Sequence, residues 1–470
     1  MQNKHFPFWI FTAAVLIALV VPVLIQDGMF MDGLLYACVA KNLSQGIGTF
    51  WHPHYSPTMH SLFDQQPPLG FGTEAIFFKL FGTSIYVERL YSFLTLCLGA
   101  FFIVKIWRLI FREEKSMQNI AWLPVLFWII IPVCFWSYSN NMLECTMVIF
   151  DLLTIFFILK FFEKNFFLHH ALAGVFIFLA SLTKGFQGLF PLAAIFFYWL
   201  VYKKISFLRM IVCSVLLLSV VSLIYILILQ NPSAKDGLTF YLHNRVQHSI
   251  ASVITVENRF YLIGRLLQEL IAPIAISLLL YLLLQKKYSE QKNYSTHFIF
   301  FLLIGISASF PLIVTLEQRG FYLVTSLPFF AISISMISAS YVTAAIEKMK
   351  PQIISFRIFR FATIAVLSGS IIFSCLQIGK FSRDEEMIHD VHLIGKVVPE
   401  KTMLGSSMEL WENWPLQEYF IRHYYICMGA DMNEKYDFIL IDSPEKIPVG
   451  LKTEKADIST VKYHLYRIIK

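Results

Sequence analysis

Side chains that could do chemistry occur next to long apolar runs of this chain. They are far apart in sequence and include both signs of charge: Asp32, Glu144, Lys184, Arg245, Arg259, Arg319 and Tyr322. Ionisable groups near a membrane core are costly to bury and are often functional. A lysine there provides a point charge for a phosphate or a carboxylate, and arginine and tyrosine supply further donors to an anion. We therefore expect these residues to share one polar cavity.

The residues around Asp32 predict an amphipathic helix. Asp32 and Tyr36 are four residues apart and so share one helix face. Leu35, Val39 and Leu43 form an apolar stripe suited to a membrane surface. A second amphipathic helix is expected over 69–81. It follows the turn that contains Gln66 and Pro67, because prolines can open a helix.

Four of these polar residues also have a simpler explanation. Asp32 could be a first-turn carboxylate that the helix dipole favours. Lys184, which is followed by Gly185, could be a lysine that snorkels from a helix end. Arg319 and Tyr322 could belong to an interfacial belt. Only their common position at one face of the membrane favours a shared site.

The composition indicates what must position these residues. Of 470 residues, 57% are hydrophobic and 15% are charged, whereas soluble domains have about 45–50% and about 25%. This excludes a disordered chain, a disulfide-rich secreted module and an ordinary cytosolic enzyme. The net charge of +7 fits basic cytoplasmic loops better than nucleic-acid binding. The seven cysteines have no metal or redox spacing and predict no disulfide framework.

Hydropathy predicts a polytopic α-helical membrane protein with about eleven spans, each near the 20 residues that a bilayer requires. The first span has no small-residue cleavage site after it and is interpreted as an uncleaved anchor. The predicted spans are 8–25, 86–107, 119–136, 141–162, 168–183, 186–202, 207–230, 263–285, 295–315, 321–343 and 360–378.

The alternate loops near 105–115, 160–164, 203–209, 286–292 and 348–360 are rich in lysine and arginine. The positive-inside rule therefore places them and the N-terminus in the cytoplasm. External segments are then 26–85, 231–262 and 379–470. We predict a membrane domain over 1–378, including the external loop 26–85, and a small external α/β domain over 379–470. A buried strand is expected within 436–441 of that domain, before an Asp-Ser-Pro turn.

Three histidines of the first external loop raise the question of a metal. His52, His54 and His60 lie near Asp64, and imidazole with carboxylate suits zinc or manganese. Ligand count alone is weak evidence, and histidines in a loop are often only polar surface. No cofactor is required by the sequence, and a divalent cation is left as an alternative.

The order of several short motifs resembles the bacterial GT-C-type glycosyltransferases that use polyprenyl-phosphate sugars. These are relatives of the protein O-mannosyltransferases and of the aminoarabinose transferase that acts on lipid A. The resemblance covers about the first 340 residues. The matching elements are an Asp-x-x-x-Tyr-Ala helix from Asp32, Pro67-Pro68-Leu69, Lys79-Leu80-Phe81-Gly82, Arg89, Glu144, Leu182-Thr183-Lys184-Gly185, and a Tyr-Leu-x-x-x-x-Pro helix from Tyr322.

The resemblance implies a role for each matching position. Asp32 corresponds to the catalytic base, and Glu144 to a second acidic position where aspartate is more usual. Lys184 and Tyr322 correspond to residues at the lipid phosphate, and Arg245, with Arg259 as a rival, to an arginine of an external loop.

Other positions complete this implied site or depart from the family pattern. Arg319 is a further phosphate candidate, and Tyr36, Gln66 and Pro67 are expected to line the cavity. Gln65-Gln66 replaces the Glu-Lys of aminoarabinose enzymes, which argues against that specific activity.

The implied reaction is attack of an acceptor oxygen on the anomeric carbon of a sugar linked to polyprenyl (undecaprenyl) phosphate. A single displacement with inversion needs one carboxylate base, whereas retention needs a carboxylate nucleophile close to the sugar. The leaving phosphate needs preorganised donors. No Walker-type or Rossmann glycine pattern occurs, which fits a lipid donor rather than a nucleotide sugar.

The predicted function is therefore transfer of a hexosyl or pentosyl group at the periplasmic face of a bacterial inner membrane. Its partners would be membrane lipid and a lipid A-type glycolipid, an envelope polysaccharide or a protein as acceptor, with no nucleic acid. The alternatives are a flippase for lipid-linked sugars and a non-catalytic membrane protein that binds glycan. Repeated halves with charges near the midplane would favour a transporter, but no internal repeat is evident.

Overall fold

The computed structural model describes residues 4–162, 166–247, 253–288 and 292–469. Parts of the predicted basic loops 160–164 and 286–292 and of the external segment 231–262 lie outside these residues. The chain divides into two compact units. We call Met1–Leu24, Gln65–Gly70 and Ser92–Ile378 the helical unit, and Ile25–Asp64, Phe71–Tyr91 and Gly379–Lys470 the α/β unit. Helices α1 (Phe6–Ile25), α3 (Leu69–Phe81) and α4 (Tyr86–Ile110) each contribute residues to both units.

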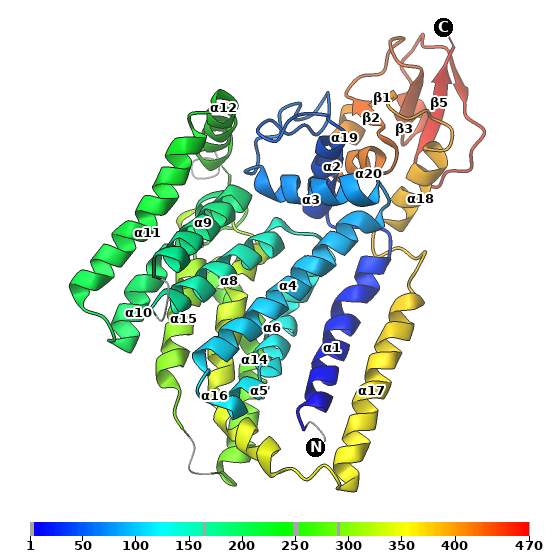
Figure 1. The fold of residues 1–470 in the computed structure, drawn as a ribbon. Coiled ribbons are helices and arrows are strands. Elements are labelled where there is room, and N and C mark those ends of the chain that lie inside the picture. Colours follow the sequence, from blue (N-terminus) through cyan, green and yellow to red (C-terminus); the bar gives the residue numbers. More distant parts are fainter. Residues whose placement is uncertain (1–3, 163–165, 248–252, 289–291, 470) are drawn as a thin grey trace. The chain divides into compact units, whose positions relative to one another are not determined.

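The helical unit consists of helices joined by short connections (Figure 1). After α4 these are α5 (Lys115–Asn119), α6 (Trp122–Ile129), α7 (Pro132–Ser139), α8 (Leu143–Phe161), α9 (Phe166–Lys184), η1 (Gly185–Ala193), α10 (Ala194–Tyr202), α11 (Phe207–Ile228), α12 (Pro232–Phe240), η2 (Tyr241–Gln247), α14 (Tyr261–Gln285), α15 (Ser295–Ser309), η3 (Phe310–Val314), η4 (Gly320–Thr325), α16 (Leu327–Lys348) and α17 (Ile354–Cys375).

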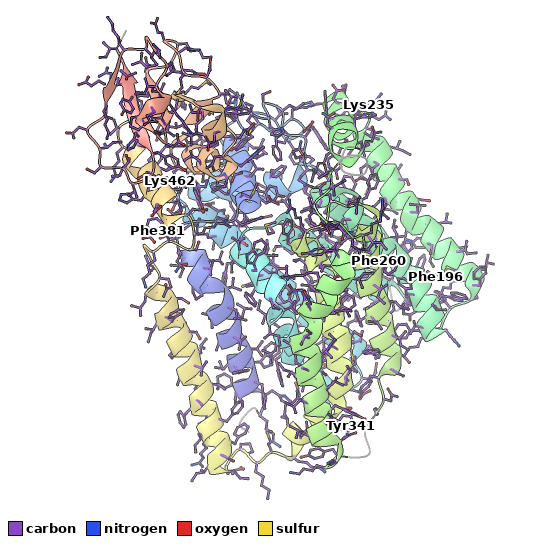
Figure 2. The ribbon with its side chains drawn as sticks, turned by 180° about the vertical axis from the view of Figure 1, so that it is seen from behind. Phe196, Lys235, Phe260, Tyr341, Phe381 and Lys462 are labelled. Atoms are coloured by element: carbon purple, nitrogen blue, oxygen red, sulfur yellow. The ribbon has the colours of Figure 1, made fainter. Side chains whose placement is uncertain are left out.

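The predicted polytopic helical architecture is confirmed. Within the described residues, eight helices are long and apolar enough to cross a membrane, and a pair bent by 80° could form a ninth. Large apolar side chains on their outer surfaces are exposed, among them Phe196 (Figure 2), Leu279 and Phe361. The eight helices or helical runs are Phe6–Ile25, Tyr86–Ile110, Phe166–Tyr202, Phe207–Ile228, Tyr261–Gln285, Ser295–Val314, Leu327–Lys348 and Ile354–Cys375, and the bent pair is Lys115–Ile129 with Pro132–Ser139.

The sequence predicts eleven spans, and this number stays a prediction. Three segments account for the difference between it and the eight helices given above. The bent pair corresponds to the predicted span 119–136. Helix α8 corresponds to 141–162, but its 19 residues include Glu144, Asp151 and Lys160, so that composition alone does not mark it as a span. The predicted spans 168–183 and 186–202 fall within one helical run that changes to a 3₁₀ turn at Gly185. Gly185 has φ +71°, a left-handed conformation that favours glycine.

The α/β unit contains the small sheet domain expected after residue 379. Its strands are β1 (Met403–Ser406), β2 (Cys427–Gly429), β3 (Phe438–Ile441), β4 (Thr453–Lys455) and β5 (His464–Ile468). They form a sheet of order β2-β1-β3-β5-β4, in which β2, β1 and β3 are parallel and β5 is antiparallel to β3 and β4. The buried strand predicted within 436–441 is β3, and the turn after it leads into η5 (Pro444–Lys446).

Helices cover this sheet and supply its core. They are α18 (Glu385–Ile394), α19 (Met408–Trp411) and α20 (Trp414–Tyr424), and α2 (Met31–Ser44) packs against α20. Ile388 of α18, Leu416 and Phe420 of α20, and Leu440 of β3 are fully buried in one hydrophobic cluster. Burial of such side chains stabilises the unit by about 1.5–3 kcal/mol each. Residues 379–470 therefore form one compact unit with 25–64 and 71–91, while the predicted domain division at 378/379 stays a prediction.

Both predicted amphipathic helices form, as α2 and α3. Most residues of α2 are buried and the helix packs against α20, whereas Leu35 and Leu43 of the predicted stripe are only partly buried. The Lys41 Nζ of α2 donates to the carbonyl oxygens of Ile421 at 3.3 Å and Arg422 at 2.6 Å. These bonds supply acceptors of the last turn of α20 with a side-chain donor. Helix α2 is thus a structural component of the α/β unit.

A buried ion pair joins α20 to the start of α4 within this unit. The Arg422 guanidinium, with 1% of the side chain exposed, donates to both carboxylate oxygens of Glu88 at 3.1 and 2.6 Å. It also donates to the carbonyl oxygens of Thr83 at 2.9 Å and Ser84 at 2.7 Å. Each of the three guanidinium nitrogens donates to an acceptor, which is the condition under which a buried charge is tolerated.

We predict that Arg422→Ala destabilises the α/β unit by about 3–5 kcal/mol, because Glu88 is left buried without this partner. The measurement is the thermal unfolding midpoint of the purified protein, together with the rate at which a protease cleaves within residues 379–470. Arg467→Ala, which removes an exposed arginine of β5, is the matched control and should shift stability by less than about 0.5 kcal/mol. Equal behaviour of the two variants would contradict the role assigned to Arg422.

Candidate functional site

The predicted residues Glu144 and Lys184 meet inside the helical unit. Glu144 stands in the first turn of α8 and Lys184 in the last turn of α9, and these two helices pack side by side. The Lys184 ammonium donates to Glu144 Oε1, and the exposed fractions of the two side chains are 6% and 0%. A buried cation costs several kcal/mol unless it is paired. The ion pair therefore accounts for the presence of both charges in this apolar environment.

Lys184 also contacts the aromatic residues of the segment 317–328. Its Nζ lies 5.0 Å from the ring centroid of Tyr322 and 5.4 Å from that of Phe321, within the range of cation–π attraction. Gln187 of η1 donates from Nε2 to the carbonyl oxygen of Tyr322 at 2.6 Å and to Thr325 Oγ1 at 3.3 Å. Two segments about 140 residues apart are thereby held together at the lysine.

The same set of contacts reaches Arg245. Its guanidinium forms an ion pair with Glu317 Oε1, and the hydroxyl of Tyr322 lies 3.5 Å from that oxygen. Arg245 belongs to η2, a short π-helix, a feature that is frequent at functional sites. Its side chain is 22% exposed, compared with 9% for Glu317. Glu144, Lys184, Tyr322, Glu317 and Arg245 thus form one connected polar cluster, which we call the ion-pair cluster.

Glu317 was not among the predicted site residues. The signal was available, because Glu317 begins the segment from which Arg319 and Tyr322 were selected. Its partner Arg245 is 72 residues away, so local spacing did not indicate the pair. Gln187 was missed for the same reason, although it follows Lys184 by three residues.

Arg259 and Arg319 have other environments. Arg259 donates from Nη1 to the carbonyl oxygen of Val314, and its own carbonyl oxygen accepts from Gln318 Nε2 at 2.7 Å. These bonds connect the segments before α14 and before η4. Arg319 is exposed at the start of η4. Their assignment to the donor phosphate stays a prediction.

Asp32 and Tyr36 belong to the α/β unit. Asp32 stands in the first turn of α2, as predicted, and is partly exposed. Tyr36 is buried with 4% exposed, and its ring centroid lies 5.8 Å from that of Phe71. The grouping of Asp32 with the ion-pair cluster stays a prediction.

A second carboxyl group is buried behind α2. Glu418 of α20 has no exposed surface, and neither carboxyl oxygen has a hydrogen-bond partner among the described residues. Burial raises the pKa of Glu418, and the nearby charge of Asp32 raises that pKa further. Both effects favour the protonated form of Glu418.

The three loop histidines have separate contacts. His54 Nδ1 donates to the carbonyl oxygen of Ser61 at 2.7 Å. The ring centroid of His60 lies 5.5 Å from that of Trp414 and 6.1 Å from that of Phe63. Among the described residues, the group of three ligand side chains close enough to hold a metal does not include His52, His54 or His60. The assignment of a metal to these histidines stays a prediction.

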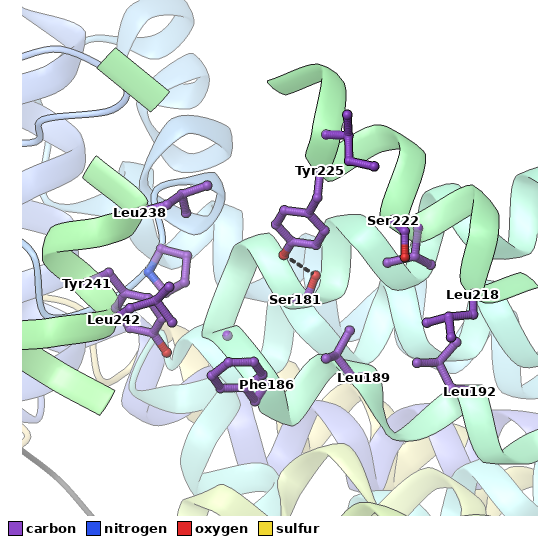
Figure 3. A pocket seen from close by; sticks show the side chains of 14 residues that line it. Ser181, Phe186, Leu189, Leu192, Leu218, Ser222, Tyr225, Leu238, Tyr241 and Leu242 are labelled. Atoms are coloured by element: carbon purple, nitrogen blue, oxygen red, sulfur yellow. Dashed lines mark hydrogen bonds between the residues drawn. The ribbon is translucent and has the colours of Figure 1, made fainter. Parts of the chain in front are cut away.

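The helical unit contains an apolar cavity of about 450 Å³, and Gly185, the residue that follows Lys184 in sequence, lines it (Figure 3). Its polar groups include the hydroxyls of Ser181 and Tyr225, which are hydrogen-bonded to each other at 2.7 Å. Gly185 and the predicted residue Pro67 are part of its wall, whereas Gln66 is not. The wall consists of Pro67, Ser181, Gly185, Phe186, Leu189, Leu192, Leu218, Val221, Ser222, Tyr225, Ile226, Leu238, Tyr241 and Leu242.

We predict that Glu144→Gln and Lys184→Met each destabilise the helical unit, because either change leaves one buried charge uncompensated, at about 3–5 kcal/mol. The double variant should be more stable than the sum of the two losses predicts, since neither charge remains. Thermal unfolding midpoints of the four proteins measure this coupling. Lys235→Met, at an exposed lysine of α12, serves as the control. Strictly additive losses would rule out the coupling.

Comparisons with known proteins place this geometry in context. Residues 65–229 match the family model described as dolichyl-phosphate-mannose-protein mannosyltransferase. No curated protein matches the chain by sequence. The crystal structure of ArnT from Cupriavidus metallidurans bound to undecaprenyl phosphate is similar over 97% of both chains, with a TM-score of 0.67 and 13% identity.

Two further crystal structures have related folds. ArnT from the same organism in the apo state matches with a TM-score of 0.64 and 13% identity, over 97% of this chain and 96% of that one. The apo oligosaccharyltransferase of Archaeoglobus fulgidus matches with a TM-score of 0.54 and 10% identity, over 93% of this chain and 65% of that one. The family match and the ArnT-like fold together confirm the predicted resemblance to the GT-C-type glycosyltransferases.

Proposed function

We propose that this chain is an integral membrane glycosyltransferase that moves a sugar from a polyprenyl phosphate donor to an acceptor hydroxyl or phosphate. The observation that carries the proposal is that Lys184 belongs to a polar cluster while the next residue, Gly185, lines an apolar cavity, in a chain with the fold of ArnT. An amphipathic donor needs both environments next to each other. Each buried CH₂ of its chain contributes about 0.8 kcal/mol, which keeps the lipid in apolar surroundings.

The apolar cavity is the proposed position of the first isoprene units. Leu189, Leu192, Leu218 and Leu242 provide hydrocarbon surface there, and Ser181 and Tyr225 satisfy each other's hydroxyl groups. A polyprenyl chain could therefore enter without leaving these two groups unpaired. Because Gly185 forms part of the wall and directly follows Lys184, we place the phosphate end of the lipid on the Lys184 side of this cavity.

The ion-pair cluster is the proposed phosphate site. Lys184, Arg245 and Tyr322 offer donors to the charge that develops on the leaving phosphate. Glu144 and Glu317 hold the two cations in place before the donor arrives. We therefore assign Glu144 as a positioning residue for Lys184 rather than as a second catalytic acid. Arg319, which is exposed, is the further candidate for this phosphate.

Asp32 is the proposed general base. It accepts the proton of the acceptor hydroxyl as the acceptor oxygen attacks the anomeric carbon. The bond between that carbon and the phosphate oxygen then breaks, and polyprenyl phosphate leaves with the bonding electrons. One displacement gives inversion at the anomeric carbon and needs one base. Tyr36, which shares a face of α2 with Asp32, is proposed to line the acceptor side.

The proposed location is the inner membrane of a bacterium. The distribution of lysine and arginine favours a cytoplasmic N-terminus. The site and residues 379–470 would then face the periplasm. The acceptor would be a lipid A-type glycolipid, an envelope polysaccharide or a protein, and the fraction that becomes labelled in a transfer assay identifies which.

We predict that Asp32→Asn lowers sugar transfer by about 10²–10⁴-fold, because the amide cannot accept the proton. The assay measures release of polyprenyl phosphate and the new glycosylated product from a labelled polyprenyl-phosphate sugar in membranes that hold each variant. Asp457→Asn, at an exposed aspartate of the α/β unit, is the control. Equal turnover in wild type and Asp32→Asn would remove Asp32 as the base. Folded wild type that turns over no sugar donor would favour transport or binding instead.

Lys184→Met should lower the maximal rate of transfer by roughly 10²–10³-fold, the usual effect of losing one donor to a developing anion. Lys184→Arg keeps the charge and should recover part of the rate. Saturation kinetics with the labelled donor separate the maximal rate from donor binding. A Lys184→Met enzyme that keeps the wild-type maximal rate would contradict this role for Lys184.

A further inference from the structure

Two histidines and one aspartate, none of them assigned to the proposed transfer site, meet in the α/β unit. Asp27 follows α1, His392 is on α18 and His423 is on α20. One ligand atom from each side chain lies within 4.8 Å of the others. His392 Nε2 is 3.0 Å from Asp27 Oδ2, and His423 Nε2 is 3.8 Å from Asp27 Oδ1. No residue of this group was selected from the sequence.

His423 has an unsatisfied nitrogen that faces the carboxylate. Its side chain is only 6% exposed, and Nε2 has no hydrogen-bond partner among the described residues. A buried polar atom without a partner costs about 1–3 kcal/mol. The distance of 3.8 Å to Asp27 is too long for a hydrogen bond. An ion between the two atoms would satisfy both.

His392 has a partner on its other ring nitrogen. Its Nδ1 lies 2.9 Å from the hydroxyl oxygen of Tyr424. The tyrosine hydroxyl can donate to this nitrogen or accept from it. When Nδ1–H donates to Tyr424, Nε2 presents its lone pair toward Asp27. Metal-binding histidines nearly always have such a partner on the second nitrogen.

Asp27 is held rigidly at the centre of the group. Its backbone N–H donates to the carbonyl oxygen of Lys380 at 2.8 Å, and its carbonyl oxygen accepts from the Ser382 N–H at 2.7 Å. Its Oδ1 also accepts from the Gly28 N–H at 2.7 Å. The Asp27 carboxylate is therefore held in place by the backbone hydrogen bonds that join residue 27 to the segment before the sheet domain.

One arginine lies beside this group. Arg89 is 3.7 Å from Asp27 Oδ1 and opposes cation binding, although it also pairs with Glu88 at 3.0 Å.

We propose that Asp27, His392 and His423 bind one divalent transition-metal ion, for which Zn²⁺ fits best. Two imidazoles with one carboxylate suit zinc rather than calcium or magnesium, which prefer oxygen ligands. Ligands at about 2.0–2.1 Å from a tetrahedral zinc ion lie roughly 3.4 Å apart. The three ligand atoms lie within 4.8 Å of one another here, so they would move closer together when they bind the ion. Three protein ligands leave a fourth position for water.

The ion would fasten three elements of the α/β unit to one another. It would join the residue that follows α1 to α18 and α20, which carry the core of the sheet domain. Its role is structural and lies beyond the proposed sugar transfer. Because the three ligands are close together only in the folded chain, zinc should bind the folded state and raise the unfolding temperature.

The test is metal binding by the full chain, purified without a polyhistidine tag and stripped with a chelator. Wild type equilibrated with Zn²⁺ should retain one zinc per chain, measured by elemental analysis, and its unfolding temperature should rise with zinc concentration. His423→Ala and Asp27→Asn should lose this zinc. Tyr424→Phe, which keeps the ligands but removes the hydroxyl, should bind about 10–100-fold more weakly. His389→Ala, at a half-exposed histidine of α18, is the matched control and should bind like wild type.

Cobalt provides a measurement that needs no variant. Co²⁺ bound to wild type in place of Zn²⁺ should show the intense visible absorption of a four-coordinate site, and Zn²⁺ should remove it. The proposal is overturned if wild type retains no zinc, if His423→Ala and Asp27→Asn retain as much as wild type, or if the four-coordinate cobalt spectrum is absent. These readouts do not depend on sugar transfer, so the two proposals can fail separately.

Discussion

The ion pair between Glu144 and Lys184 is the interaction on which the helical unit depends. Neither charge could remain in these apolar surroundings without the other, because an unpaired buried ion costs several kcal/mol. Their pairing fixes the start of α8 against the end of α9. The helix gives way to a 3₁₀ turn at Gly185, the residue after Lys184. Tyr322, Glu317 and Arg245 extend the pair into a cluster, and an apolar cavity begins at the same turn.

The α/β unit uses buried charge in a related way. Arg422 and Glu88 form a hydrogen-bonded ion pair, whereas the Glu418 carboxyl oxygens have no hydrogen-bond partner among the described residues, and burial raises the pKa of Glu418. Asp27, His392 and His423 form a third case. Their side chains lie close together, but His423 Nε2 has no hydrogen-bond partner among the described residues. A sheet of five short strands has a small hydrophobic core, so ion pairs such as Arg422–Glu88 add to the stability of the unit. They also connect residues 25–64 and 71–91 to residues 379–470 within the unit.

The similarity to ArnT concerns the fold, and the chemistry depends on the individual side chains. At 13% identity the same helical architecture is kept over 97% of the chain. Gln65 and Gln66 stand where aminoarabinose enzymes are expected to have Glu-Lys, so the cations of this chain must come from other positions. Lys184 and Arg245 are suitable, and each has its own carboxylate partner. The acceptor and the sugar are determined by contacts that differ among proteins of one fold.

The sequence by itself determined the elements and the local faces of this protein. The apolar runs predicted the membrane helices, Pro67-Pro68 predicted the helix that forms as Leu69–Phe81, and residues 436–441 predicted the strand Phe438–Ile441. Only the tertiary structure decided which distant side chains meet. The Arg245–Glu317 pair and the Asp27–His392–His423 group join residues between 31 and 396 positions apart. Periodicity reports which residues share a face of one helix or strand, because those neighbours are set by local backbone geometry. Contacts between elements depend on how the whole chain packs, and residue spacing alone does not predict them.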